Sequence, residues 1–543
     1  MTWPTTTDHK LSEYYAMEMP GQQLAAAHAD SVLDNVLKLD LKAPAGCLKV
    51  TTIMATMGQS TYDVEIMYKM MAAGMNIAVL NMTFGTVEEH IETIRMLREA
   101  AERFKETMGK VYPLAIALRL AGRKIRTGKI AEGFGDHVEL VTGESVRLTT
   151  EDTYRERCSK STIFVDFSGF AEQVRKGDVV LLDNERIELQ VEIISSTTLT
   201  CKIERGGILG TNKDVFVPSV VFDMPDYAKA IKNDVQLAID QNVDFLIASF
   251  VSTVHNIKEL QTLLKSKRKT IGIIANIQSI DGFRNIDQIL TVSNGIVVTR
   301  QELGSDLTPK KLPVAQKNLI AKANMANVPV CINCHLLSSM RVSRVSTRAE
   351  LLDIANCILD GADCLELGPE TAVGIDPVLT VATMTSACRE AEACLWTKGI
   401  NSDFIFKTPT PCDHLTGISL TAMLAAQRSI ASAIIVVTSS GKTAQVVSQF
   451  KPRCPIIALT RYETVSRQLH LYRGVVPFLY EGKPLAEWLD DVDVRAKAAM
   501  KWALEIGFVR IGDPIVLVYS WKQKSSYTNS MRIMYVPHEL QKP

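Results

Sequence analysis

Residues 49–80 read KVTTIMATMGQSTYDVEIMYKMMAAGMNIAVL, and this stretch decides the fold class. The apolar run Lys49–Thr56 predicts a strand, Val64–Ala73 has the spacing of a helix with one apolar face, and Asn76–Leu80 predicts a second strand. Short apolar strands that alternate with helices are typical of βα units in a parallel sheet. We therefore expect this part of the chain to adopt an α/β fold.

The same alternation continues on both sides of an interruption. Val87–Phe104 predicts a long helix and Leu114–Leu118 a third strand. After the interruption, further strands are predicted at Phe245–Phe250, Thr270–Ile274, Gly295–Val298, Val328–Ile332 and Cys364–Leu367. About eight strands in this pattern favour a (β/α)8 barrel.

Two further segments lie outside this alternation. Residues 122–223 consist of short β-rich runs between glycine and polar turns, which predicts a small inserted β-barrel or sandwich domain. Apolar strands recur after residue 430 and predict a second α/β domain. The expected organisation is an N-terminal arm at 1–43, the barrel at 44–121 and 224–395, the β domain at 122–223 and a C-terminal α/β domain at 396–543.

The composition limits the functional classes. The chain has 543 residues, 46% of them apolar, and 60 basic residues balance 60 acidic ones, which gives no electrostatic argument for a nucleic-acid partner. No apolar run approaches the roughly 18 residues that cross a bilayer, and no secretory signal is recognisable at the start. The odd number of cysteines, 11, suits a reducing compartment. We expect a cytoplasmic protein that binds a small molecule or another protein.

Several segments, taken in order along the chain, resemble the pyruvate kinase family. They are Gly74–Ala78 followed by Leu80-Asn81, Ser346–Glu350, Asp360–Cys364, Pro369–Ala372, His470–Gly474 and Thr528-Asn529. The resemblance covers nearly all of the chain after residue 44. It implies a (β/α)8 TIM barrel, an inserted β lid and a C-terminal effector domain. It also implies phosphoryl transfer from phosphoenolpyruvate to ADP, giving pyruvate and ATP in glycolysis, with Mg²⁺ and K⁺, in a tetramer.

This chain departs from the family at residues that carry the chemistry. In the family motif, a lysine beside the transferred phosphoryl group is followed two residues later by a glutamate on the divalent metal; here these positions are Asn276 and Gln278. An amide replaces a cation at the first, and a weak neutral ligand replaces a carboxylate at the second. The arginine with which the family clamps phosphate is Val79, which cannot hold an anion.

The next motif is partly retained. Thr299–Gly304 reads TRQELG where the family has Ala-Arg-Gly-Asp-Leu-Gly. Arg300 is kept, Glu302 stands for the second metal carboxylate with one extra methylene, and Gln301 replaces a glycine whose backbone approaches the substrate carboxylate. Cys334 replaces the threonine near the substrate methylene.

The potassium positions are half replaced, whereas the nucleotide positions are retained. Of the four oxygen-bearing potassium positions, Asn81 and Thr83 remain competent, whereas the other two are Arg119 and Leu120. The guanidinium of Arg119 could stand where the cation sits in the family. Arg126 and Lys213 resemble the family's nucleotide contacts.

An effector site is predicted in the C-terminal domain. An apolar strand, a turn rich in hydroxyl groups and the start of a helix together aim backbone N–H groups at one point, as phosphate sites require. The segment resembles the sugar-phosphate loop of animal-type pyruvate kinases, and the predicted contacts are Thr438, Ser439, Ser440, Gly441, Lys442, Thr443, Trp488, Arg495 and Trp521. The alternative is a solvated helix cap.

Two weaker signals have simpler explanations. The segment 331–335, CINCH, matches a haem-attachment pattern, but core thiols explain it better because no second cysteine pair lies nearby. The basic run 265–269 is best explained as a solvated loop, not a nucleic-acid site.

Two functional hypotheses remain open at this stage. The first is a pseudoenzyme of the pyruvate kinase family, with little or no activity and with a binding or assembly role as a homo- or hetero-tetramer. The second is a working but altered pyruvate kinase, in which Glu302 holds the metal and Arg300 and Arg119 supply positive charge, with a shifted substrate preference. Nearby groups such as Arg119, Arg123 and Lys124 are the candidates for compensating the lost residues.

Overall fold

The computed structural model describes residues 23–27, 29–43, 48–109, 111–121, 125–183, 186–218, 220, 225–266, 270–522 and 527–541. The parts of the predicted arm before residue 23, Arg123, Lys124 and residues 267–269 of the basic run therefore lie outside the described residues. The chain divides into two compact units, and each is considered by itself.

The first unit contains a closed parallel barrel, as the βα pattern predicts. Its strands follow the order β1-β17-β16-β15-β14-β13-β3-β2. They are β1 (Thr52–Thr56), β2 (Ile77–Asn81), β3 (Ala115–Arg119), β13 (Phe245–Ala248), β14 (Gly272–Ile277), β15 (Gly295–Thr299), β16 (Val330–Asn333) and β17 (Cys364–Leu367). Because sequential strands are neighbours and parallel, all carboxyl ends meet at one mouth, where such barrels place their chemistry.

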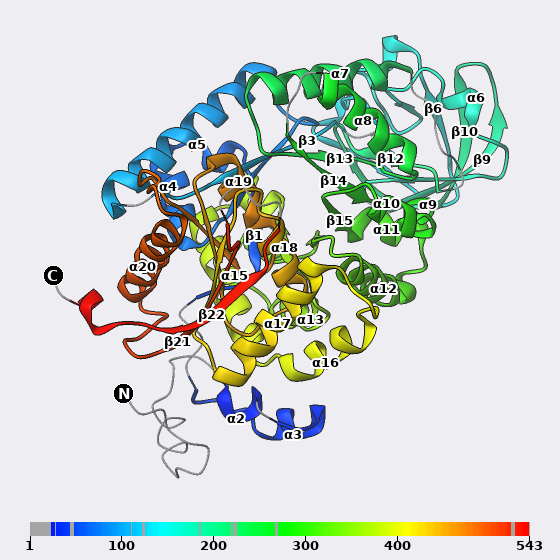
Figure 1. The fold of residues 1–543 in the computed structure, drawn as a ribbon. Helices are drawn as coiled ribbons and strands as arrows, with labels where there is room; N and C mark the ends of the chain where they lie inside the picture. Colours follow the sequence, from blue (N-terminus) through cyan, green and yellow to red (C-terminus); the bar gives the residue numbers. More distant parts are fainter. Residues whose placement is uncertain are drawn as a thin grey trace. The chain divides into compact units, whose positions relative to one another are not determined.

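Helices connect the strands (Figure 1). They include α4 (Val64–Ala73), α5 (Val87–Met108), α8 (Val254–Ser266), α9 (Ile280–Arg284), α10 (Ile286–Leu290), α12 (Leu312–Met325), α13 (Arg348–Leu359), α14 (Pro369–Ala372) and α15 (Pro377–Ala393). The division between the two units falls inside two more helices, α7 (Pro225–Asp240) and α11 (Arg300–Asp306).

The motifs that carried the family resemblance have local structural reasons. Thr347 and Glu350 form a reciprocal capping box at the start of α13. Gly74 ends α4 with φ 116°, and a Cβ there would come within 2.5 Å of Thr385 Oγ1, so this position requires glycine. Asp363 accepts a hydrogen bond from the backbone N–H of Val330 and holds two barrel strands together.

The C-terminal α/β domain belongs to the same unit. Its sheet has the order β20-β19-β18-β21-β22, with an antiparallel last pair that Figure 1 shows side by side in orange and red. The strands are β18 (Ala433–Val437), β19 (Ile456–Thr460), β20 (Val475–Leu479), β21 (Pro514–Tyr519) and β22 (Ser530–Tyr535). The helices are α16 (Thr397–Lys407), α17 (His414–Ser429), α18 (Lys442–Gln449), α19 (Glu463–Gln468) and α20 (Trp488–Ile506), and α2 (Leu24–Ala27) and α3 (Val32–Leu37) precede the barrel.

The C-terminal domain closes the amino-terminal end of the barrel. Leu471 belongs to the apolar cluster inside the barrel, and its carbonyl oxygen accepts a hydrogen bond from the Cys364 thiol. The ion pairs Arg467–Asp244 and Lys451–Asp363 add buried polar contacts between the two domains. The domains are therefore joined by a mixed apolar and charged interface.

The second unit comprises Ala121–Gln236 and Glu302–Lys311 and is mostly β structure, as predicted for the inserted segment. One sheet has the order β4-β12-β8-β9-β10-β6-β7, and β11 pairs with β5. The strands are β4 (Ile125–Arg126), β5 (His137–Leu140), β6 (Ser145–Thr149), β7 (Thr162–Phe164), β8 (Val179–Leu182), β9 (Ile187–Ile194), β10 (Thr198–Arg205), β11 (Gly207–Gly210) and β12 (Asp214–Phe216), with α6 (Phe170–Gln173). Their alternate buried side chains form a separate apolar core.

Candidate active site

A layer of polar side chains lies at the carboxyl ends of the barrel strands. The barrel core contains Val79, Ala117, Ile274, Val297, Cys331 and Cys364. Alternate residues of a strand face the same side, so the residues two positions further along continue this inner face. They are Asn81, Arg119, Asn276, Thr299, Asn333 and Glu366. The apolar core thus ends in a polar layer at the mouth.

Arg119 and Glu366 form an ion pair within this layer. Arg119 Nη2 lies 2.5 Å from Glu366 Oε1 and 2.6 Å from Oε2. The Glu366 side chain is 1% exposed and that of Arg119 is 12% exposed. Burial alone would lower the pKa of Arg119, but Glu366, together with the nearby thiols of Cys334 and Cys331, raises it above the ordinary value. The pair links β3 to β17, which are separated by β2 and β1 in the barrel.

Asn276 is held by its neighbour strand. Its Oδ1 accepts a hydrogen bond of 2.6 Å from Thr299 Oγ1, and its side chain is fully buried. Its Nδ2 has no hydrogen-bond partner among the described residues. Gln278, at the end of the same strand, accepts a 2.9 Å hydrogen bond from the backbone N–H of Phe250 through Oε1. Both positions therefore present neutral amides.

Arg300 is engaged on all sides of its guanidinium. Nη1 and Nη2 donate to the two carboxylate oxygens of Asp353 at 2.8 and 2.7 Å, and Nε and Nη2 donate to the carbonyl of Cys334 at 3.1 and 2.6 Å. A bidentate pair of this kind fixes both orientation and charge. Arg300 thus orders the turn that follows β16.

Most of the remaining predicted residues of the mouth are either buried apolar side chains or polar side chains bonded to near neighbours in the sequence. Val79 is fully buried in the barrel core, and Leu120 is 1% exposed. Asn81 Oδ1 accepts from the backbone N–H of Thr83 at 3.1 Å. Cys334 has φ 72° and its thiol donates to Asn333 Oδ1 at 2.8 Å. Gln301 follows Arg300 on α11, and Glu302 continues the same helix in the second unit.

Comparison with protein families identifies the fold's relatives. A sequence model described as the pyruvate kinase barrel domain matches residues 48–381, and one described as the pyruvate kinase alpha/beta domain matches residues 416–534. The chain belongs to the pyruvate kinase family. The resemblance inferred from the sequence motifs is thereby confirmed, as is the fold class.

Pyruvate kinases of animals and fungi are similar to the whole chain. Pyruvate kinase PKLR of Rattus norvegicus and that of Homo sapiens are each 37% identical over 515 residues, which are 95% of this chain and 90% of the relative. Pyruvate kinase 1 of Saccharomyces cerevisiae is 32% identical over 507 residues, 93% of this chain and 100% of the relative. The similarity therefore spans the barrel, the inserted domain and the C-terminal domain together.

The two positions that resemble nucleotide contacts of pyruvate kinase lie in the second unit. Lys213 Nζ lies 3.0 Å from Asp183 Oδ1, and Arg126 Nε lies 3.7 Å from Asp214 Oδ1. The backbone N–H of Arg126 donates to Asp166 Oδ1 at 2.7 Å. Both basic side chains are thus held by carboxylates of their own unit.

The predicted effector loop connects β18 to α18. Thr438 Oγ1 accepts from the N–H of Gly441 at 2.9 Å, Ser440 Oγ accepts from Lys442 at 3.5 Å, and Thr443 Oγ1 lies 2.7 Å from Thr528 Oγ1. The loop is therefore held by hydrogen bonds of its own, and Ser439 and Ser440 are exposed.

The other predicted effector residues make contacts inside the protein. Arg495 donates to Asp491 and lies over the Trp488 ring at 5.4 Å, while Trp488 Nε1 donates to the carbonyl of Ser520 at 2.6 Å. Trp521 is 61% exposed.

The cysteine motif belongs to the barrel. Cys331 is buried in the apolar core, and burial raises the pKa of its thiol well above the ordinary value. Within the described ranges, no group of three His, Cys, Asp or Glu side chains is arranged to hold a metal ion. None of the helices described there combines the length and apolarity needed to cross a bilayer.

Sequence reasoning missed Glu366 and Asp353, the two carboxylates that pair with arginines at the mouth. A signal for Glu366 was present. It lies in the apolar strand Cys364–Leu367, two residues after Cys364, so alternation places a charge on the inner face of a barrel strand. A charge in that place requires a counter-ion, and Arg119 was the available cation.

Proposed function

We propose that this chain is a pyruvate kinase homologue that performs little or no phosphoryl transfer and acts through binding or assembly. The observation that carries the proposal is the buried Arg119–Glu366 ion pair at the barrel mouth. Within the polar layer, the positive charge of Arg119 is balanced by the negative charge of Glu366. An anionic substrate would have to compete with Glu366 for the guanidinium.

Electrostatics supports the proposal. Phosphoryl transfer depends on positive charge and alignment around the transferred group, because little covalent chemistry is left to the protein. Here position 276 carries an amide, position 79 carries valine, and the guanidinium of Arg300 is matched by Asp353. Losing one such donor typically costs about 10² to 10³ in rate, and we expect the combined loss to exceed roughly 10⁴.

The donor set does not fit the family's metal ions. Mg²⁺ prefers charged oxygen ligands, whereas Gln278 is neutral and its Oε1 already accepts from Phe250. At the potassium position, Arg119 places a fixed cation and Leu120 a buried apolar side chain. We infer that both cation sites are degraded, and no step of a mechanism is assigned to either ion.

The alternative, an altered but working pyruvate kinase, would use Arg119 as an internal cation and Glu302 on the metal. The buried guanidinium at the potassium position is the observation that favours it. Its charge is neutralised by Glu366 at 2.5 Å, however, so the pair adds almost no net positive field. The pseudoenzyme hypothesis therefore accounts better for the geometry.

A binding role has two candidate forms. The loop Thr438–Thr443 offers the exposed Ser439 and Ser440 side chains to a sugar phosphate. The family resemblance implies tetramers, either of this chain alone or with an active pyruvate kinase. A sugar bisphosphate that protects the protein against thermal unfolding, with protection lost in Ser439→Ala, would support the effector role.

Metal binding tests the proposal separately from activity. Mn²⁺ is titrated into the purified protein with and without phosphoenolpyruvate, and the free ion is followed by its paramagnetic resonance signal. The proposal predicts no saturable binding below about millimolar Mn²⁺, because a hard cation finds no charged oxygen cluster. Tight binding that disappears in Glu302→Gln would overturn it and favour the altered enzyme.

A further inference from the structure

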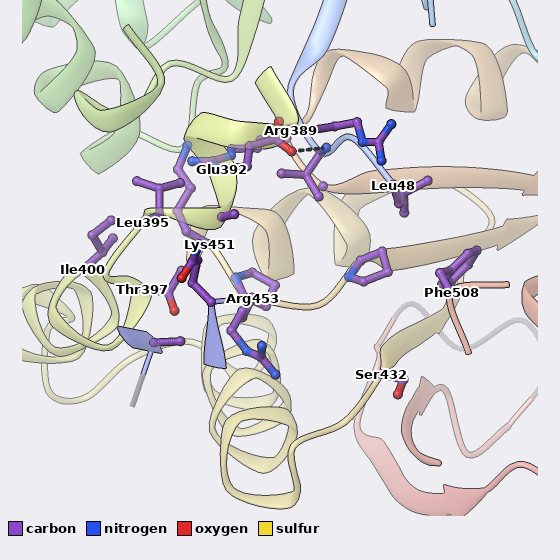
Figure 2. Close-up of a pocket in the computed structure, with 18 of the residues that line it drawn as sticks. Leu48, Arg389, Glu392, Leu395, Thr397, Ile400, Ser432, Lys451, Arg453 and Phe508 are labelled. Atoms are coloured by element: carbon purple, nitrogen blue, oxygen red, sulfur yellow. Dashed lines mark hydrogen bonds between the residues drawn. The ribbon is translucent and has the colours of Figure 1, made fainter. Parts of the chain in front are cut away.

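A cavity outside the catalytic mouth lies between the barrel and the C-terminal domain, within the first unit. Its volume is about 120 Å³. The lining comes from the N-terminal segment at Gln23 and Ala27, from Leu48 and Val50 before β1, from the end of α15 and the start of α16, and from C-terminal domain segments around Lys451, Arg473 and Phe508. Figure 2 shows Arg389, Glu392 and Lys451 among the labelled side chains that surround it.

Basic residues outnumber acidic ones in the lining. Arg389, Lys451, Arg453 and Arg473 face a single acidic residue, Glu392. Glu392 is already used, because its two carboxylate oxygens accept from the backbone N–H groups of Val50 and Thr51 at 2.9 and 2.7 Å. Figure 2 draws one bond of this residue as a dashed line. The cavity therefore has an excess of positive charge.

Arg473 is the cation that lacks a counter-ion. It is 8% exposed, and across the described ranges its guanidinium has neither a hydrogen bond nor an ion pair. Only its carbonyl oxygen is bonded, to Ser448 Oγ at 2.7 Å. Lys451, by contrast, is paired with Asp363. A mostly buried guanidinium without a protein partner is usually matched in native proteins by water, an ion or a ligand.

The other walls of the cavity are apolar. They include Leu48, Val50, Leu395, Ile400 and Phe508. An apolar protein cavity of about 150 Å³ holds a molecule the size of benzene. An arginine binds a carboxylate through two parallel hydrogen bonds, which suits one guanidinium at the end of an apolar space.

We propose that this cavity binds a small organic carboxylate. The carboxylate group would pair with the Arg473 guanidinium, and a compact apolar body would pack against the apolar side chains that line the cavity, such as Leu48 and Phe508. The ligand would touch the barrel and the C-terminal domain at once. Binding would therefore strengthen the interface between them, since a ligand that binds only the folded state stabilises that state. The proposal is independent of whether phosphoryl transfer is retained.

Benzoate is a suitable probe, with uncharged benzamide and inorganic phosphate as comparisons. Isothermal titration calorimetry on the full chain is expected to detect saturable binding of benzoate, no binding of benzamide and much weaker binding of phosphate. Arg473→Met should weaken benzoate binding at least about tenfold, because a charge-assisted hydrogen bond is lost. Arg473→Lys should retain part of it.

Matched variants separate binding from folding. Arg428→Met, at an exposed arginine near the end of α17, should bind benzoate as the unmodified protein does. Ile400→Trp keeps Arg473 but fills the cavity from its apolar side, and it should abolish binding. The proposal is overturned if benzoate does not bind, if phosphate binds as tightly as benzoate, or if neither Arg473→Met nor Ile400→Trp changes its affinity.

Discussion

Arg119 on β3 and Glu366 on β17 meet in a buried ion pair across the mouth of the barrel, although they are 247 residues apart in the chain. The family resemblance implies a carboxylate for a monovalent cation at the position of Arg119. Here this position supplies the cation itself, and Glu366 supplies the carboxylate. The two charges satisfy each other at the mouth, whereas phosphoryl transfer depends on positive charge around the transferred group.

Removing one partner of the Arg119–Glu366 pair should destabilise the protein far more than removing both. Glu366→Gln should lower the free energy of unfolding by about 3 kcal/mol, because it leaves the Arg119 guanidinium buried without a counter-ion. The double variant Arg119→Met with Glu366→Met should lie within about 1 kcal/mol of the unmodified protein. Urea unfolding measures both. An equal loss in the two variants would show that the pair is not coupled as described.

The Arg300–Asp353 ion pair should contribute more to stability than the more exposed Lys322–Asp287 pair. Asp353→Asn should cost about 2 kcal/mol of unfolding free energy, because it removes the bidentate partner of an arginine side chain that is 7% exposed; the Asp353 side chain itself is 32% exposed. The control Asp287→Asn breaks the Lys322 pair, whose side chains are 36% and 68% exposed, and should cost less than about 1 kcal/mol. Comparable losses would contradict the assigned role of Asp353.

His470 predicts a pH dependence of stability. Burial, aided by the charge of Lys49, lowers the pKa of His470 to about 3, from about 6.5 in the unfolded chain. Between these values the unfolded chain binds a proton that the folded protein does not. The contribution of His470 is therefore fully present above pH 6.5 and is lost as the pH falls toward 3.

Between pH 6.5 and 4.5 this loss should amount to about 2–3 kcal/mol, since each pH unit corresponds to about 1.4 kcal/mol. Urea unfolding at a series of pH values measures it. His470→Gln should flatten the slope by close to one proton, whereas His255→Gln, at an exposed histidine on α8, should not. An unchanged slope in His470→Gln would contradict the assignment.

Restoring two family residues tests how far the mouth has changed. Asn276→Lys with Gln278→Glu places a cation and a carboxylate at the two positions to which the family resemblance assigns the phosphoryl-side lysine and a metal ligand. We expect pyruvate formation to rise less than about tenfold, because Val79 and the Arg119–Glu366 pair remain. The neutral control Asn276→Gln with Gln278→Asn should behave like the unmodified chain. A rise of about a hundredfold or more would point to a site that lacks only these two residues.

Much of the fold could be predicted from local patterns. The helix Val64–Ala73 and the strands Cys364–Leu367 and Ala433–Val437 have the predicted bounds, because apolar spacing defines them. The strand predicted at Thr270–Ile274 runs instead over Gly272–Ile277 and includes the polar Asn276, which interrupts the apolar run. β22 (Ser530–Tyr535) was missed because this edge strand mixes polar and apolar residues.

The site could be predicted only in part. The family resemblance supplied the positions of Asn276, Arg119 and Arg300, but their partners Thr299, Glu366 and Asp353 depend on contacts between strands and helices distant in sequence. A single sequence does not specify such pairs. Arg473 was missed for the same reason, since its lack of a counter-ion becomes evident only when the cavity around it is known.

The rate of pyruvate formation from phosphoenolpyruvate and ADP tests the central claim most directly. The purified chain is assayed with Mg²⁺ or Mn²⁺, with and without K⁺, beside an active pyruvate kinase at equal concentration. The account predicts a rate at least about 10⁴-fold below that of the active enzyme, and no response to K⁺. Robust turnover would contradict it, and turnover that needs no K⁺ would identify Arg119 as an internal cation.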